Sequence, residues 1–248
     1  MKKLKVLVLR KRTICLASIL LLVPVIILLS INHFILSSKD TFVDPGSGII
    51  VIDPGHGGID GGTNRDGILE KEVNLAIAKK LKTKLEEKGY KIVMTREEDI
   101  SLEQYSNTGG SRHRRDLNAR VEIINNSNAQ LFVSIHVNCN LKRPATDGSI
   151  VFYSDKYEQS KTLAYCIQRS LNSMIVNGKK RTTHDPQKGN YYILNNSEIP
   201  GVIVETAFIS NPVEKELLLK DEFREYLAES IADGIIKYLN NPETVFDE

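Results

Sequence analysis

The residues Ile50–Gly58 read IVIDPGHGG, and the residues Leu131–Asn138 read LFVSIHVN. Each stretch begins as an apolar, β-branched run typical of a buried strand, and each carries a histidine, His56 or His136, where that run stops. In α/β proteins, ligands and metals gather at the carboxyl ends of the sheet strands. Because two imidazoles would be delivered to that edge, a metal site is the first hypothesis to test.

A third apolar run, Ile203–Phe208, carries the carboxylate Glu205, the type of base that zinc hydrolases use. Such enzymes usually hold zinc through three protein ligands and keep one position open. For the third ligand, the sequence offers Glu70 or Glu72, which lie at the entry to a predicted helix after a glycine-rich turn. The residues alone leave both open, and Glu205 would face the open position as general base.

Strand-like and helix-like segments alternate along the rest of the chain, which predicts the α/β class. We expect a single domain with a mixed, mostly parallel, twisted sheet that is flanked by helices on both faces. The segment 100–115 is expected to be a loop. Strands are predicted at 49–53, 91–95, 131–136, 149–153, 191–194 and 202–205, and helices at 71–88, 117–124, 158–174, from about 212, and at 221–239.

The N-terminus has six cations between Lys2 and Arg12, followed by an apolar stretch of 18 residues from Ile14 to about Ile31. A bilayer needs ~20 such residues, and flanking positive charge stays on the cytoplasmic side. We therefore expect an uncleaved membrane anchor rather than a cleaved signal peptide, with the rest of the chain extracytoplasmic. The predicted organisation is a signal anchor at 1–37 with its transmembrane helix at about 14–36, a linker at 38–48, and a catalytic domain at 49–240.

Charge and cysteine content exclude two other classes of protein. The formal net charge of +2 over 248 residues hides an asymmetry, because residues 1–40 carry seven basic residues and one acidic residue. The remainder has a net charge of −4, so no nucleic-acid footprint is present and no nucleic-acid partner is expected. Only Cys139 and Cys166 lie in the body of the chain, too few for a disulfide framework.

Four ordered motifs together carry a resemblance to a known family: DPGHGG at 53–58, EKEVNL at 70–75, SIHVN at 134–138 and VETAFISN at 204–211. The chain resembles the zinc-dependent N-acetylmuramoyl-L-alanine amidases over about residues 49–240, and among these the short, membrane-anchored type associated with sporulation and germination. Two small departures are visible, Cys139 where the family usually has alanine and Ala207 where glycine is frequent.

The resemblance implies a Zn²⁺ cofactor with His56, Glu70 and His136 as its ligands and Glu205 as the catalytic residue. By analogy, it also settles the choice of Glu70 over Glu72. The implied reaction is hydrolysis of the amide bond between N-acetylmuramic acid and L-alanine in peptidoglycan, in spore cortex or cell-wall remodelling. Asn138 would either contact the substrate or cap a turn at the strand end.

The implied partners are peptidoglycan, the membrane through the N-terminal anchor, and an activating protein. Two other functions stay open: a catalytically silent wall-binding protein on the same fold, and another zinc hydrolase such as a peptidase or a glycan deacetylase. The chain has no H-E-x-x-H helix motif, which argues against the commonest metallopeptidases. The intact set of two histidines and two glutamates favours an enzyme over a silent binder.

Overall fold

A computed structural model describes residues 48–241 of the chain. The predicted membrane anchor and nearly all of the predicted linker lie outside the described residues. Within residues 48–241, no helix is both long and apolar enough to cross a membrane.

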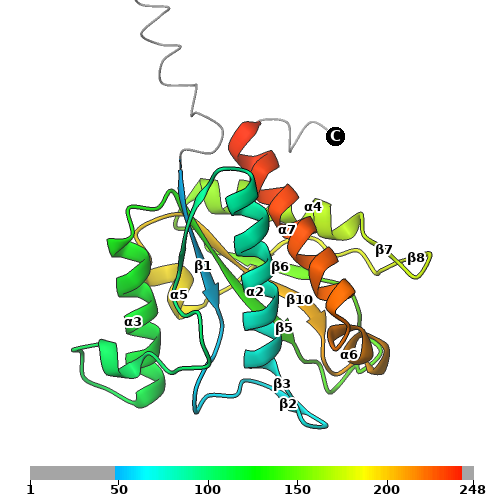
Figure 1. The fold of residues 1–248 in the computed structure, drawn as a ribbon, viewed down its shortest axis with the longest axis horizontal. Coiled ribbons are helices and arrows are strands. Elements are labelled where there is room, and N and C mark those ends of the chain that lie inside the picture. Colours follow the sequence, from blue (N-terminus) through cyan, green and yellow to red (C-terminus); the bar gives the residue numbers. More distant parts are fainter. Residues whose placement is uncertain (1–47, 242–248) are drawn as a thin grey trace, which may run out of the picture. The chain divides into compact units, whose positions relative to one another are not determined.

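The centre of the domain is a six-stranded sheet in the order β4-β1-β5-β10-β6-β9 (Figure 1). The first four strands are parallel, and β6 runs antiparallel to β10. This confirms the mixed, mostly parallel sheet. The strands are β1 (Ile49–Pro54), β4 (Lys91–Met94), β5 (Leu131–Asn138), β6 (Ile150–Tyr153), β9 (Gln187–Lys188) and β10 (Gly201–Phe208).

Helices cover both faces of this sheet. On one face, the larger apolar core joins the sheet to α2 (Glu70–Glu87), α4 (Glu158–Asn172) and α7 (Asp221–Asn240). On the other face, a smaller core packs beneath α3 (Arg112–Asn126) and α5 (Tyr192–Asn196). Burial on both faces explains why the central strands read as continuous apolar runs. The remaining elements are η1 (Glu103–Tyr105), α6 (Pro212–Leu218), the hairpin β2 (Asn64–Arg65) with β3 (Ile68–Leu69), and the hairpin β7 (Ile175–Val176) with β8 (Lys179–Lys180).

Two predicted elements differ from the structure. The strand predicted at 191–194 was wrong, because this segment forms the short helix α5, whose Ile193 and Leu194 pack into the smaller core. The predicted loop at 100–115 was too long. It contains the 3₁₀ turn η1, and α3 starts at Arg112, where the Ser111 side chain caps the helix by accepting a hydrogen bond from the Arg114 amide.

Candidate active site

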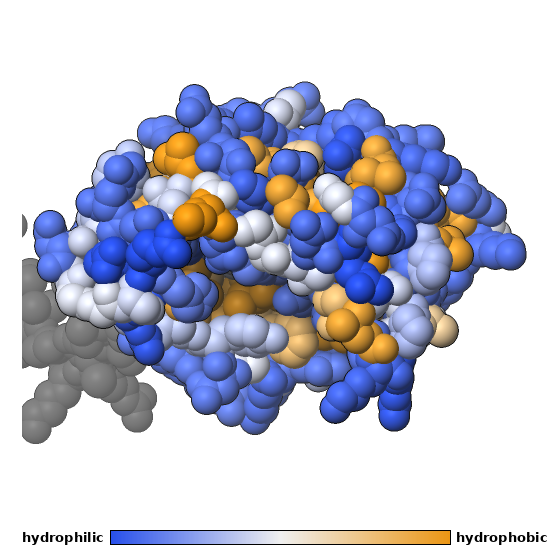
Figure 2. All heavy atoms as spheres, turned by 90° about the horizontal axis from the view of Figure 1, so that it is seen from below, coloured by the Kyte–Doolittle hydropathy of each residue, from blue (hydrophilic) through white to orange (hydrophobic). Residues whose placement is uncertain are grey.

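The carboxyl ends of β1, β5 and β10 meet at one edge of the sheet and deliver His56, His136 and Glu205 to the same place. Glu205 is directly paired with His136 in the parallel ladder. The domain is hollowed on this side (Figure 2), and a cavity of about 760 Å³ opens there. His56, Glu70, His136, Asn138 and Glu205 all line it, so the structure brings together every predicted site residue.

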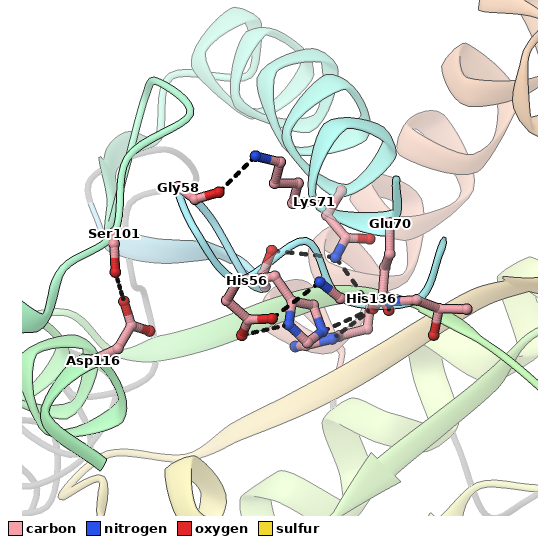
Figure 3. A network of polar contacts seen from close by, with 12 residues as sticks. His56, Gly58, Glu70, Lys71, Ser101, Asp116 and His136 are labelled. Carbon is pink, nitrogen blue, oxygen red and sulfur yellow. Dashed lines mark hydrogen bonds and ion pairs between the residues drawn. The ribbon is translucent and has the colours of Figure 1, made fainter. Parts of the chain in front are cut away.

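His56, Glu70 and His136 form a compact three-residue cluster (Figure 3). One ligand atom from each residue lies within 4.8 Å of the other two. Glu70 Oε1 is 3.2 Å from His56 Nε2 and 3.1 Å from His136 Nδ1. The two imidazole rings meet edge to face, with their centroids 5.0 Å apart. Two nitrogens and one carboxylate oxygen in this arrangement make a potential metal site of the kind that leaves a coordination position open.

Glu70 is placed for this role by the start of α2. It is the first residue of the helix and only 4% exposed, whereas Glu72 faces solvent. Its second carboxylate oxygen accepts a hydrogen bond from the Thr63 amide at 2.8 Å. Although burial alone would raise the pKa of Glu70, its contacts with His136 and His56 hold that pKa far below its usual range. Glu70 is therefore a fixed negative charge between the two rings.

Close backbone approach explains two of the glycines around His56. A Cβ on Gly55 would lie 2.2 Å from the His136 ring, and one on Gly62 would lie 2.7 Å from both Glu70 and His56. Gly62 also has φ +64°, a conformation that side chains disfavour. His56 itself has φ +61°, which is uncommon for a residue with a side chain. The glycine-rich turn thus lets the backbone fold tightly enough for the three ligands to meet.

Two buried arginines donate hydrogen bonds to the backbone carbonyls of the turn at residues 54–56. Arg120 donates to the carbonyls of Pro54 and His56 at 2.8 and 2.6 Å, and Arg96 donates to the carbonyls of Pro54 and Gly55 at 2.9 Å each. These contacts pair backbone acceptors that leave the sheet ladder where β1 ends, and buried carbonyls without partners are costly.

The charge of Arg120 is compensated by Asp53, which it contacts at 2.6 Å. Burial alone would raise the pKa of Asp53. Arg120 and the hydroxyls of Ser134 and Thr95 outweigh this effect and lower the pKa to about 2. Asp53 is therefore ionised at neutral pH, and the pair remains intact there. Neither the paired aspartate nor the arginines stand out in the sequence as support for a site.

Asp60 orients the His56 ring from the outer side. Its Oδ2 lies 2.9 Å from His56 Nδ1, and its Oδ1 accepts from the Gly62 amide. Burial alone would lower the pKa of His56. Contacts with Glu70 and Asp60 outweigh this effect and raise the pKa to about 9. A site that binds a proton this strongly favours positive charge, and a divalent cation between the same ligands would meet the same demand.

Glu205 lines the same cavity, and one of its carboxylate oxygens is buried without a partner. Its Oε2 is shielded from solvent and has no hydrogen-bond partner among the described residues. Burial raises the pKa of Glu205 to about 7; the nearby His136 and His56 oppose this rise, and the negative charge of Glu70 adds to it. A carboxyl group with this pKa in a cavity can both accept and release a proton at neutral pH, as a general acid–base group must.

The cavity also has residues that were not among the predicted site residues. Besides Asp60, its lining includes Tyr191 and the exposed Arg112 and His113 at the start of α3. Cys139, noted as a departure from the family pattern, lines the cavity as a free thiol but does not belong to the three-residue cluster. The GHGGID motif could have indicated Asp60, because a carboxylate four residues after a ligand histidine can fold back onto it.

Comparison with known proteins agrees with this geometry. Residues 50–237 match the N-acetylmuramoyl-L-alanine amidase family. The germination-specific N-acetylmuramoyl-L-alanine amidase of Bacillus subtilis is 37% identical over 219 residues, which cover 86% of this chain and 90% of the relative. AmiA of Escherichia coli, also an N-acetylmuramoyl-L-alanine amidase, is 30% identical over 236 residues, covering 79% and 77% of the two chains.

Among solved structures, the CwlD amidase of Clostridioides difficile, determined in complex with the GerS lipoprotein, is similar with a TM-score of 0.70. It is 36% identical, and the match covers 77% of this chain and 98% of that one. The expected resemblance to the germination type and the expectation of an amidase are confirmed by these similarities. The chain belongs to the N-acetylmuramoyl-L-alanine amidase family.

Proposed function

We propose that this chain hydrolyses the amide bond between the lactyl group of N-acetylmuramic acid and L-alanine in peptidoglycan. His56, Glu70 and His136 would hold a zinc ion, and Glu205 would act as general base. The observation that carries the proposal is the enclosed, unpartnered Oε2 of Glu205 in the same cavity as the three-residue cluster. An orphaned buried oxygen calls for a partner, and an attacking water would supply one.

The donor set fits zinc, which is commonly bound by histidine and carboxylate in hydrolases. When bound, zinc would supply a Lewis acid that polarises the scissile carbonyl and makes water a better nucleophile. Asp60 prepares the ring of His56 for this role. If His56 Nδ1 carries its proton toward Asp60, Nε2 presents its lone pair to the ion, which is the usual arrangement around metal-bound histidines.

Glu205 would perform the proton transfers. Its carboxylate would accept a proton from the attacking water and then deliver it to the nitrogen of the departing amine. The second transfer is essential, because an amide nitrogen is a very poor leaving group unless it is protonated. Burial, which raises the pKa of Glu205 to about 7 in the metal-free site, favours its acceptance of a proton, and the ladder pairing of Glu205 with His136 keeps the carboxylate beside the cluster.

The cavity wall suggests how the substrate is held. Asn138 offers both amide donors and a carbonyl acceptor to a peptide or acetamido group, and we assign it to substrate binding. The stem peptide carries carboxylates, and Arg112 and His113 on the same wall can pair with them. The position of the Arg112 cation on this wall gives the peptide side of the substrate a preferred direction.

The germination-specific relative supports a role in spore cortex, with cell-wall remodelling as the broader setting. The complex of the Clostridioides difficile relative with a lipoprotein supports an activating protein partner. The proposed domain organisation fits this role. An anchor at 1–37 would hold the catalytic domain, residues 49–240, on the extracytoplasmic side of the membrane, close to peptidoglycan.

Digestion of purified peptidoglycan with the full chain, followed by mass spectrometry, tests the proposed reaction. An amidase releases stem peptides that begin with a free L-alanine amine and leaves glycan strands whose lactyl groups end in a carboxylate. Glu205→Gln is the matched control for contaminating hydrolases. Cleavage within the peptide would indicate a peptidase, and loss of acetyl groups would indicate a deacetylase. The absence of any product from zinc-loaded protein with its candidate partner would favour the silent binder.

A further inference from the structure

The strand that carries Glu205 is irregular immediately after this residue. Between Glu205 and Phe208, β10 has one residue more than the facing segment of β5, which is a β-bulge. On its other side, the pairing of β10 with β6 also ends at Glu205. The carbonyl of Thr206 therefore lies where the β5 ladder is interrupted and the β6 ladder has ended, although Thr206 is fully buried.

A buried arginine from another part of the chain takes the place of the missing ladder. Arg181 Nη2 donates to the Thr206 carbonyl at 3.0 Å, and Arg181 Nη1 donates to Ser149 Oγ at 2.9 Å. Ser149 Oγ in turn donates to the same Thr206 carbonyl at 2.7 Å. Two donors thus converge on the one acceptor that the bulge leaves open.

Glu214 fixes the arginine and the end of the bulge together. Its Oε1 is 2.5 Å from Arg181 Nη2, and its Oε2 accepts the Phe208 amide at 2.7 Å. Both side chains are almost fully buried, at 7% and 3% exposure. The backbone on the C-terminal side of Glu205 is consequently held at its first residue, Thr206, and at its third, Phe208. Arg181 lines a cavity separate from the one that contains Glu205, so it acts only through the backbone.

We propose that Arg181 is a positioning residue for the Glu205 carboxylate, acting through the carbonyl of Thr206. This inference rests on the proposed role of Glu205 as general base. A guanidinium is required because one planar group must reach Glu214, Ser149 and Thr206 in fixed directions, which the single ammonium of lysine cannot do. A misplacement of about 1 Å at a reacting group can cost ~10²-fold in rate.

The test is a double-mutant cycle on the full, zinc-loaded chain with a soluble peptidoglycan fragment as substrate. Arg181→Lys keeps the charge opposite Glu214 but breaks the fork. It should lower kcat at least 10-fold, with KM and bound zinc within about two-fold of wild type. Combined with Glu205→Gln, it should lower the residual kcat no further, because a residue that acts through Glu205 has nothing left to position.

Ser149→Ala is the second variant. It removes one donor to Thr206 and one acceptor of Arg181 but keeps the ion pair between Arg181 and Glu214. Ser149→Ala should lower kcat by a few-fold and leave KM unchanged. This variant keeps the inference testable if Arg181→Lys folds poorly. Ile235→Val, in the α7 side of the core, is the control for a loss of stability alone, and its kcat should equal that of wild type.

Three results would overturn the inference: wild-type kcat in Arg181→Lys and Ser149→Ala, a change confined to KM, or effects that multiply in the double mutant. Full activity of Glu205→Gln is a separate outcome. It would remove the proposed general base, and it would be seen before the Arg181 variants are compared.

Discussion

Replacing Glu205 by glutamine should stabilise the metal-free protein in a pH-dependent way. Burial raises the pKa of Glu205 from its usual value near 4.5 to about 7, so the folded state binds this proton more tightly than the unfolded state. The sign follows: the protein keeps the associated stability at low pH and loses it as the pH rises through 7.

The magnitude follows from the same shift. Each pKa unit corresponds to ~1.4 kcal/mol, so the rise from 4.5 to about 7 amounts to about 3 kcal/mol in full. Glu205 is only partly buried as a whole residue, and solvent reduces the expected loss between pH 5 and pH 8 to about 2 kcal/mol. Glu205→Gln carries no charge at either pH and should escape this loss.

The assay is urea denaturation of chelator-treated wild type and Glu205→Gln, each at pH 5 and pH 8. The difference in unfolding free energy between the two proteins should favour the variant by about 2 kcal/mol more at pH 8 than at pH 5. With zinc restored, the variant should retain the metal yet lose turnover by at least ~10²–10⁴-fold. A stability difference that does not change with pH would refute the reasoning, since the carboxylate would then titrate normally.

Three further predictions concern the metal and the substrate. His136→Ala should be strongly depleted of zinc by elemental analysis, because a two-ligand site remains; stoichiometric zinc in both this variant and His56→Ala would contradict the ligand assignment. Asp60→Asn should weaken zinc binding ~10–100-fold in competition with a chelator, and unchanged affinity would show that the His56 ring is oriented without it. Arg112→Ala should raise KM for peptidoglycan fragments while leaving zinc content unchanged, whereas Arg115→Ala, which is outside the cavity lining, should have no effect; equal effects would argue against a carboxylate contact at Arg112.

The sequence predicted the sheet and the long helices well because their signals are local and strong. Continuous apolar runs marked β1, β5 and β10, and near-helical spacing marked α2, which ends just before Gly89 as predicted. The segment 191–194 failed for the opposite reason: it is short and has strand-forming residue types, so its helix depends on packing that the sequence does not display. The hairpins β2–β3 and β7–β8 were not predicted for a similar reason, because their strands have only two residues each and show no hydrophobic periodicity.

For the site, the strand-end rule placed His56, His136 and Glu205 at one edge from the sequence alone, and the structure confirms that they share a cavity. The choice between Glu70 and Glu72 needed the family resemblance, since both lie in the first turn of α2. In the structure, the burial of Glu70 makes the difference plain. Hydrophobic periodicity could not show which glutamate is buried, because a helix that started a residue or two later would turn Glu72 inward in place of Glu70.

The supporting residues could not have been found this way, and the reason is physical. The three arginines are each nearly fully buried: Arg96, Arg120 and Arg181. From sequence, an arginine is expected on the solvent-exposed surface. Buried ion pairs contribute little net stability, because desolvation offsets much of their attraction. Here their guanidinium groups pair backbone carbonyls at the two places where the site departs from regular structure.

The two places are the left-handed turn at His56, served by Arg120, and the bulge after Glu205, served by Arg181. The chain leaves regular pairing at the metal ligand His56 and directly after the general base Glu205, and each departure leaves a buried carbonyl without a ladder partner. An apolar side chain of the same volume could fill the space but could not pair that oxygen. Each of these two arginines is then paired with carboxylates: Arg120 with Asp53 and Asp116, and Arg181 with Glu214. The buried ion pairs thus follow from the geometry that the chemistry demands.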